Sequence, residues 1–318
     1  MNEYDDEYYK KQIEIALYIE FIYYEMYEGI IKASRIIHLP KNRIFLFKDH
    51  LKINKTVDGI IDSHTSKLID KIKDSVKWSW EQANQKNDDI IKKMFDKHDM
   101  TPPKDLLNHN RRQFTEFQSR KTNGFTLSER VWDYNKHPNL KNEIQELINN
   151  AIREGRSAQQ LSEDVRKYLK EPEKLFRRIR GKDGNLKLSP EALKYNPGKG
   201  VYRSAYKNAL RLAREEINRA YRESEWERWQ QNPAVIGYKI VTSNRVATVC
   251  PLCKELAGVY PKSFKFVGWH IQCLCHCEPI LCSDSEFDRI LRDKNYVPEQ
   301  PDMPQQYIEY ENNGYSIL

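Results

Sequence analysis

The stretch that decides the fold of the C-terminal region lies between residues 250 and 282 and contains all six cysteines of the 318-residue chain. It reads Cys250-Pro-Leu-Cys253, then sixteen residues, then His270-Ile-Gln-Cys273-Leu-Cys275-His-Cys277, with Cys282 just beyond. Cys-x-x-Cys and His-x-x-Cys are spacings of tetrahedral zinc sites, because a tight turn aims both side chains of each pair at one point. The stretch therefore predicts a metal-binding module.

The best ligand set has four members and a fifth in reserve: Cys250, Cys253, His270 and Cys273, then Cys275. Four protein ligands fill the coordination shell of zinc, so such a site is structural and leaves no position for a catalytic water. Two other interpretations stay open. One is a set of thiols without a metal, and the other is a thioredoxin-like redox pair, which would not need His270 or Cys273.

No motif in the chain indicates catalysis. A zinc deaminase needs His-x-Glu followed by Pro-Cys-x-x-Cys. Here His270 is followed by Ile271 and Gln272, and the order of the two motifs is reversed. The sequence also has no Walker loop, dinucleotide glycine motif, nucleophile elbow or His-Glu-x-x-His motif. We therefore expect a protein that is not an enzyme.

The charge of the chain is unevenly distributed. The chain has 53 Lys and Arg against 46 Asp and Glu, a net charge of +7, and 31% of its residues are charged. Residues 151–230 hold 20 Lys and Arg against 12 Asp and Glu, a local charge of +8, whereas the first seven residues and the tail after Lys294 are acidic. The basic middle suggests a polyanionic partner, most simply nucleic acid, although a solvated helical surface explains the same charges.

No signal peptide or transmembrane segment is visible. The run from Ile13 to Ile31 is apolar but is interrupted by Glu14, Glu20, Glu25 and Glu28. These charges argue against membrane insertion. We therefore expect a chain that folds in a reducing cytoplasm without a membrane partner, where clustered cysteines indicate a metal more often than disulfides.

Hydrophobic spacing predicts long helices. Apolar residues recur mostly three and four apart over residues 8–38 and 56–98, and a stripe of small residues follows 202–231. Three stretches of the form Ser/Thr-x-x-Glu/Gln predict capping boxes that open shorter helices, at Thr126, Ser157 and Ser283.

A basic hairpin is predicted in residues 174–188, where Gly181 and Gly184 bracket a turn between two short strand-like runs. Phosphate contacts by such a cluster would be salt-dependent, and no groove-reading helix accompanies it, so we predict non-specific binding of double-stranded DNA. A solvated loop, or a surface for an acidic protein, is the alternative. The predicted DNA-binding residues are Lys174, Arg177, Arg178, Arg180, Lys182 and Lys187.

The predicted fold class is mainly α with a small α+β zinc-binding C-terminal module, in which residues 235–241 form a strand. The expected regions are an N-terminal helical region (1–100), a basic helical core with the hairpin (110–232), the α+β zinc module (233–295) and a flexible acidic tail (296–318). Seven of the 19 tyrosines lie in the first 27 residues. This suits either an interface or a helix packed on its own domain.

The stretch Arg203-Ser-Ala-Tyr-Lys-Asn-Ala-Leu-Arg-Leu-Ala-Arg-Glu-Glu-Ile-Asn-Arg-Ala-Tyr221 resembles the Ala-Arg-Thr-Glu helix of phage head morphogenesis proteins, the Mu F-like minor head proteins. The family continues with a strand, a Cys- or His-bearing turn, a Leu-x-Gly-x-x-Tyr-Pro stretch and a His-Pro-x-Cys-x-Cys end. This chain has Cys250-Pro-Leu-Cys253-Lys-Glu-Leu-Ala-Gly-Val-Tyr-Pro261 and His270-Ile-Gln-Cys273-Leu-Cys275. Glu215 and Ile271 stand where the family has threonine and proline.

The resemblance covers about residues 120–285 and implies a structural protein of the virion. Such minor head proteins bind the portal during head assembly, stay in the capsid interior with the genome, and affect DNA packaging and ejection. It implies the portal and other head proteins as partners, allows a homo-oligomer around the portal, and places the chain in the host cytoplasm during assembly. The alternative is a non-virion, zinc-dependent nucleic-acid-binding protein.

Overall fold

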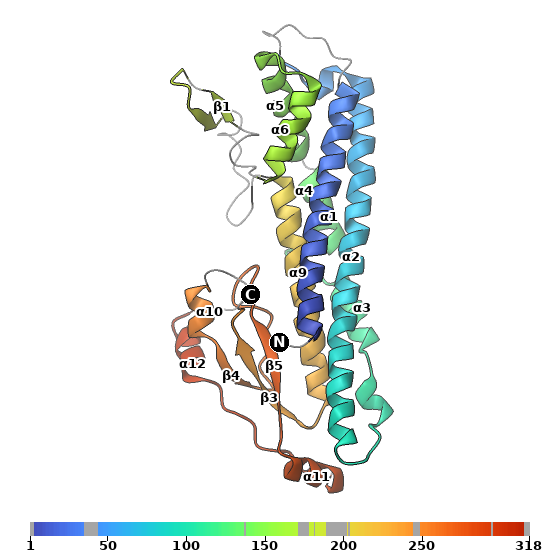
Figure 1. Ribbon diagram of the computed structural model, residues 1–318, viewed down its shortest axis with the longest axis vertical. Coiled ribbons are helices and arrows are strands. Elements are labelled where there is room, and N and C mark those ends of the chain that lie inside the picture. The colour runs from blue at the N-terminus through green and yellow to red at the C-terminus, as the bar shows by residue number, and fades with distance from the viewer. Residues whose placement is uncertain are drawn as a thin grey trace. The chain divides into compact units, whose positions relative to one another are not determined.

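The computed structural model describes residues 3–34, 44–136, 138–170, 178–180, 182–188, 202, 204–243, 249–293 and 295–314. It is mainly α with a small α+β C-terminal module, which confirms the predicted fold class (Figure 1). The helices are α1 (Glu3–Ser34), α2 (Leu51–Asp96), α3 (Arg111–Ser119), α4 (Leu127–Lys136), α5 (Pro138–Glu154), α6 (Ala158–Lys170), α9 (Ala205–Gln231), α10 (Pro251–Glu255), α11 (Asp284–Arg292) and α12 (Gln305–Asn312). Short 3₁₀ turns cover Phe47–Asp49 and Lys104–Leu107.

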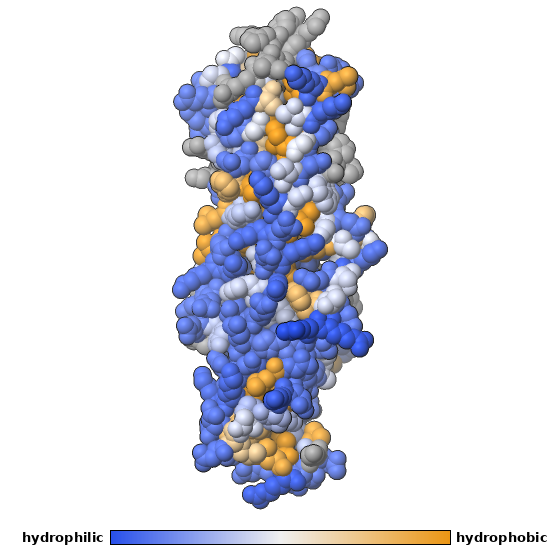
Figure 2. Space-filling model, turned by 90° about the vertical axis from the view of Figure 1, so that its right-hand side faces the viewer, coloured by the Kyte–Doolittle hydropathy of each residue, from blue (hydrophilic) through white to orange (hydrophobic). Residues whose placement is uncertain are grey.

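The surface of these helices is largely polar. Figure 2 shows one face of the molecule, on which hydrophilic residues cover most of the area and hydrophobic residues form small patches. None of the described helices combines the length and the hydropathy needed to cross a membrane.

The chain forms two compact units, and each is built from separated segments. Unit 1 contains Met1–Lys11, Asp74–Ser119 and Arg214–Leu318, and unit 2 contains Gln12–Lys73 and Arg120–Ala213. The division falls within α1, α2 and α9. The region boundaries expected from the sequence stay predictions, because the units are not contiguous stretches of chain.

Unit 2 is mainly helical and buries two tyrosines of α1, Tyr23 and Tyr27. The side chains of Tyr23 and Tyr27 are both 0% exposed. The Tyr23 hydroxyl donates to the Asn135 side chain, and the Tyr27 hydroxyl donates to Glu143 at 3.3 Å. The sequence allowed either an interface or a helix packed on its own domain. Tyr23 and Tyr27 fit the second interpretation.

The three predicted capping boxes are all present. The backbone amides of three residues each donate to the hydroxyl oxygen three positions earlier in the chain. They are Glu129, Gln160 and Glu286, and the distances are 3.3, 3.2 and 3.3 Å. The side chains of the same residues accept the amides of Thr126, Ser157 and Ser283 in return. Each box satisfies two amides that the first helical turn would otherwise leave without a partner.

The predicted hairpin is formed by β1 (Arg178–Arg180) and β2 (Leu186–Leu188), which pair antiparallel with Ile179 opposite Lys187. Gly184 lies in its turn with a φ of +76°, a conformation that glycine adopts without steric cost. Lys182 and Lys187 are exposed. Lys174 and Arg177 lie outside the described residues, so the binding of DNA by this cluster stays a prediction.

The C-terminal module of unit 1 is a three-stranded antiparallel sheet in the order β4-β3-β5. Its strands are β3 (Val235–Val241), as predicted, β4 (Gly258–Pro261) and β5 (His276–Leu281). An aromatic core lies against the sheet. Tyr238 of β3 and Tyr260 of β4 lie directly opposite each other in the register, so both side chains point to the side of this core. The buried aromatic residues of this core are Trp229, Tyr238, Tyr260, Phe264, Phe266, Trp269 and Tyr307.

The acidic tail, for which composition predicts flexibility, contributes side chains to the core of the module. It contains α12, whose Tyr307 is 7% exposed and packs on Tyr260 and Phe264 with ring centroids 5.9 and 4.8 Å apart. Gly237 of β3 leaves room for Pro301, whose Cγ would lie 2.6 Å from a Cβ at that position. The few apolar residues of the described part of the tail, residues 295–314, therefore complete the core of the module.

Candidate metal centre

Three short elements of the module carry the predicted ligands. Cys250 is the cap residue before α10, Pro251 occupies the first turn of that helix, and Cys253 follows within it. Proline suits this position because its fixed φ is already helical and the first-turn amide has no partner to lose. The loop between β4 and β5 carries the other three predicted ligands, His270, Cys273 and Cys275.

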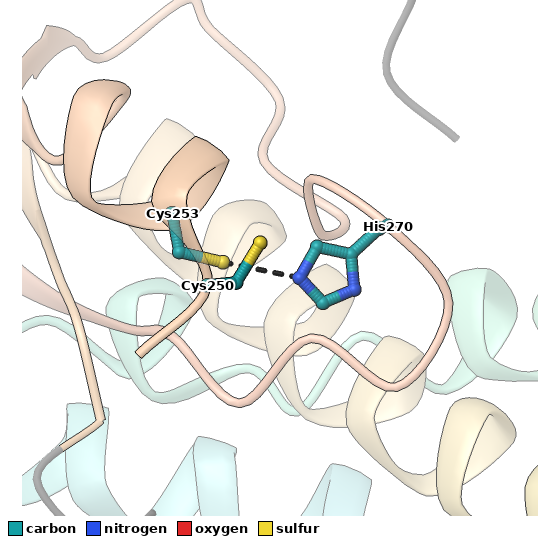
Figure 3. Close-up of side chains that lie close together, drawn as sticks. All are labelled: Cys250, Cys253 and His270. Carbon is teal, nitrogen blue, oxygen red and sulfur yellow. Dashed lines mark hydrogen bonds between the residues drawn. The ribbon is translucent and has the colours of Figure 1, made fainter. Parts of the chain in front are cut away.

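The folded chain brings these five residues together in two overlapping groups. Cys250, Cys253 and His270 form one group, shown in Figure 3, and Cys253, Cys273 and Cys275 form the other. Within each group the donor atoms lie within 4.8 Å of one another. The Cys253 Sγ lies 3.1 Å from His270 Nε2 and 3.9 Å from Cys273 Sγ.

These distances suit a tetrahedral metal ion. Zinc–sulfur and zinc–nitrogen bonds of about 2.3 and 2.0 Å place neighbouring ligand atoms roughly 3.4–3.8 Å apart. The cluster could therefore hold a metal ion with only small shifts of its side chains. Cys253 belongs to both groups, and the four-ligand set of Cys250, Cys253, His270 and Cys273 stays a prediction.

The thiols of the second group have unequal proton affinities. A hydrogen bond from the Cys275 thiol, with help from the nearby Arg222 guanidinium, lowers the pKa of Cys273 to about 4. Burial, and the repulsion of Cys273, raise the pKa of Cys253 to about 12, and the bond that Cys275 donates raises the pKa of Cys275. Without a metal, these pKa shifts favour a negative charge on the Cys273 sulfur, whereas Cys253 and Cys275 keep their protons. A bound cation would release those protons, since thiolates are the metal-binding form.

The two remaining cysteines lie in neither group. Cys277, in β5, is 3% exposed, and burial raises its pKa well above the ordinary value for a thiol. Cys282 is half-buried beside the cluster that contains Phe95 and Phe287, and burial raises its pKa as well. Both therefore behave as protonated packing residues.

Sequence patterns missed the residues of α9 that hold the loop between β4 and β5, residues 262–275, which is called the metal-binding loop below for its candidate ligands. Arg222 donates to three carbonyl oxygens of this loop, and Asn218 donates to the Cys273 carbonyl at 3.2 Å. Glu215 accepts the amide of Gln272 at 2.8 Å. The three residues are spaced i, i+3 and i+7, which places them on one face of a helix. That spacing is the signal that could have identified them.

A buried ion pair joins α9 to α2. Lys86 Nζ lies 2.6 Å from Glu225 Oε1, and the two side chains are 6% and 2% exposed. Asp5, near the N-terminus, lies 3.9 Å from the same amine. Charges buried to this degree are stable only when paired, so this pair is a fixed part of unit 1.

Comparisons of the chain with models of protein families, with curated proteins and with solved structures find no match. The donor cluster and the helix that supports it are therefore the observations from which a function can be inferred.

Proposed function

We propose that the chain is a phage minor head protein, a non-enzymatic structural component inside the capsid near the portal that assists head assembly and DNA packaging or ejection. Its C-terminal module is closed by a structural zinc ion. Its partners are the portal, other head proteins and, through the basic hairpin, double-stranded DNA without sequence preference.

One observation carries this proposal. Two of the stretches that resemble minor head proteins, residues 203–221 and residues 250–275, are joined by hydrogen bonds between residues of the unit 1 segment Arg214–Leu318. Glu215 and Asn218 of the first stretch bond Gln272 and Cys273 of the second. A similarity in two separated stretches is more specific when the stretches meet in space, because one module then accounts for both.

The donor set supports zinc as the metal. Three thiolates and one imidazole are the ligands of structural zinc sites, and calcium and magnesium prefer oxygen ligands. A closed shell of four protein ligands would stabilise a small sheet of three short strands. This role needs no catalytic residue.

The charges of the chain support a position beside DNA. The turn and second strand of the hairpin present Lys182 and Lys187 to solvent, in a region with a local charge of +8. Lysines at such positions attract phosphates without reading bases.

The test is the location of the chain in particles of the phage whose genome encodes it. Heads would be purified on a density gradient and treated with protease before and after they are opened, and the chain would be detected with an antibody. We expect the chain to stay with the heads, to be protected until they are opened, and to cross-link to the portal.

The same experiment distinguishes the proposed function from the alternative one. A non-virion nucleic-acid-binding protein would be absent from purified heads and would be recovered with cellular DNA at low salt. Absence from the heads, or digestion of the chain while the heads are closed, would overturn the proposal.

A further inference from the structure

Arg222 lies at the centre of the contacts between α9 and the metal-binding loop. Its Nη1 donates to the Val267 carbonyl at 2.7 Å, and its Nη2 donates to the carbonyls of Cys273 and Cys275 at 2.5 and 2.9 Å. The residue is 6% exposed. One rigid guanidinium therefore fixes the backbone on both sides of His270 and at two cysteines.

The surroundings of Arg222 are shaped to admit it. Gly268 has a φ of +131°, and a Cβ at that position would lie 2.7 Å from Arg222 Nη1. The ring of Phe266 lies 5.0 Å from the guanidinium carbon and covers one of its faces. A side chain at position 268 would displace the guanidinium, so the position of Arg222 depends on glycine at 268.

Charge gives Arg222 a second role. Zinc with three thiolates and one neutral imidazole carries a net charge of −1, and a buried net charge is costly unless an opposite charge lies nearby. Lys86 is paired with Glu225 and Asp5, whereas Arg222 bonds the loop itself. A set of four thiolates that included Cys275 instead of His270 would carry −2, which one arginine would not offset.

We infer that Arg222 is the positioning residue of the metal centre. It holds the loop that carries His270, Cys273 and Cys275 in the ligand geometry, and its charge offsets that of a zinc ion bound by three thiolates and His270. This inference rests on the proposed zinc site.

The test uses the full-length protein and two ways of disturbing the same contact. Arg222→Lys keeps the charge but cannot reach three carbonyls, and Gly268→Ala displaces the guanidinium without changing it. Zn²⁺ affinity would be measured by competition with a chelating dye, and Co²⁺ would report the ligand set through its absorption spectrum. We expect each variant to bind Zn²⁺ on the order of 10- to 100-fold more weakly, which is typical for residues that orient metal ligands.

Arg228→Lys is the matched control. Arg228 is a buried arginine of the same helix, but it bonds Asp88 and the Asn108 carbonyl instead of the loop. We expect this variant to lower the unfolding temperature while its Zn²⁺ affinity changes by less than about threefold. An equal loss of affinity in the control would mean that general destabilisation, not positioning, explains the effect.

Two further variants test the charge and the ligand set. Arg222→Met should bind Zn²⁺ more weakly than Arg222→Lys, because it also removes the positive charge, and equal affinities would overturn the charge role. Cys275→Ser should leave the Co²⁺ spectrum unchanged, and a loss of thiolate-to-cobalt absorption would overturn the ligand set of Cys250, Cys253, His270 and Cys273.

The outcomes also separate this inference from the zinc site itself. If the unsubstituted protein binds neither Zn²⁺ nor Co²⁺, the zinc site fails. If it binds both and the Arg222 and Gly268 variants bind equally well, the zinc site stands and the positioning role fails.

Discussion

At the scale of single residues, Cys253 is the candidate ligand on which a metal site in this cluster would depend. It belongs to both groups of donor atoms and is 4% exposed, whereas Cys250 is half-buried. Its position inside α10 fixes the direction of its sulfur through the helix backbone. A change at this residue therefore removes a ligand that neither group can replace.

We expect Cys253→Ala to reduce the bound zinc from about one ion per chain to almost none. A ligand present at about 1,000 times its dissociation constant stabilises the folded state by about 4 kcal/mol, and the variant should lose a contribution of that order. Elemental analysis and thermal unfolding would measure both effects. Cys282→Ala, which changes a cysteine outside both donor groups, should keep its zinc. A fully folded, metal-bound Cys253→Ala protein would rule out the structural zinc site.

At the scale of elements, the capping boxes show that local sequence alone can specify where a helix begins. The box of α11 joins Ser283 and Glu286 by two reciprocal bonds, of 3.3 Å from the Glu286 amide and 2.9 Å from the Ser283 amide. These partners lie within one helical turn, so their geometry follows from the helix. The helix then packs Phe287 against Phe95 of α2, with ring centroids 5.3 Å apart.

We expect Ser283→Ala to destabilise α11 by about 1 kcal/mol, the usual contribution of such a cap. Hydrogen exchange of residues 284–292 would measure the loss, and Ser283→Thr should preserve most of the protection.

The same cap should depend on pH. Hydrogen bonds from the Ser283 side chain and backbone lower the pKa of Glu286 in the folded state. A lowered folded pKa means that the stabilisation is present above the ordinary glutamate pKa and is lost as pH falls through the folded value. The difference between the protein and Ser283→Ala should therefore be constant at neutral pH and shrink in acid. A difference that grows in acid would contradict this assignment.

At the scale of the whole molecule, the two units should respond differently to metal removal. All five candidate donors lie in unit 1, within the segment Arg214–Leu318. The core of unit 2 is formed by other segments and contains none of these donors.

We expect a chelator to increase hydrogen exchange strongly in β3 and β5 and much less in α5 and α6 of unit 2. Mass spectrometry of exchanged peptides would measure this, with zinc-saturated chelator as the control. Equal loss of protection in both units, or none in either, would show that the metal does not stabilise unit 1 selectively.

The sequence by itself determined the local structure of this protein. Hydrophobic spacing located the long helices and β3, the Ser/Thr-x-x-Glu/Gln stretches located three caps, and glycines located the turn of the hairpin. Each of these features depends on residues a few positions apart. The spacing of cysteines and His270 likewise located the five donors that meet in space.

Only the tertiary structure decided what depends on distant residues. It assembled unit 1 from three separated segments, packed Tyr307 of the tail into the core of the module, and bonded Arg222 to the loop between β4 and β5. Composition counts charges and prolines and cannot show that Tyr307 is buried, because that burial requires a core built by β4 and the loop after it. The role of Arg222 could not be predicted from the sequence for the same physical reason. It depends on which carbonyl groups the guanidinium bonds, and those of Cys273 and Cys275 lie about fifty residues away along the chain.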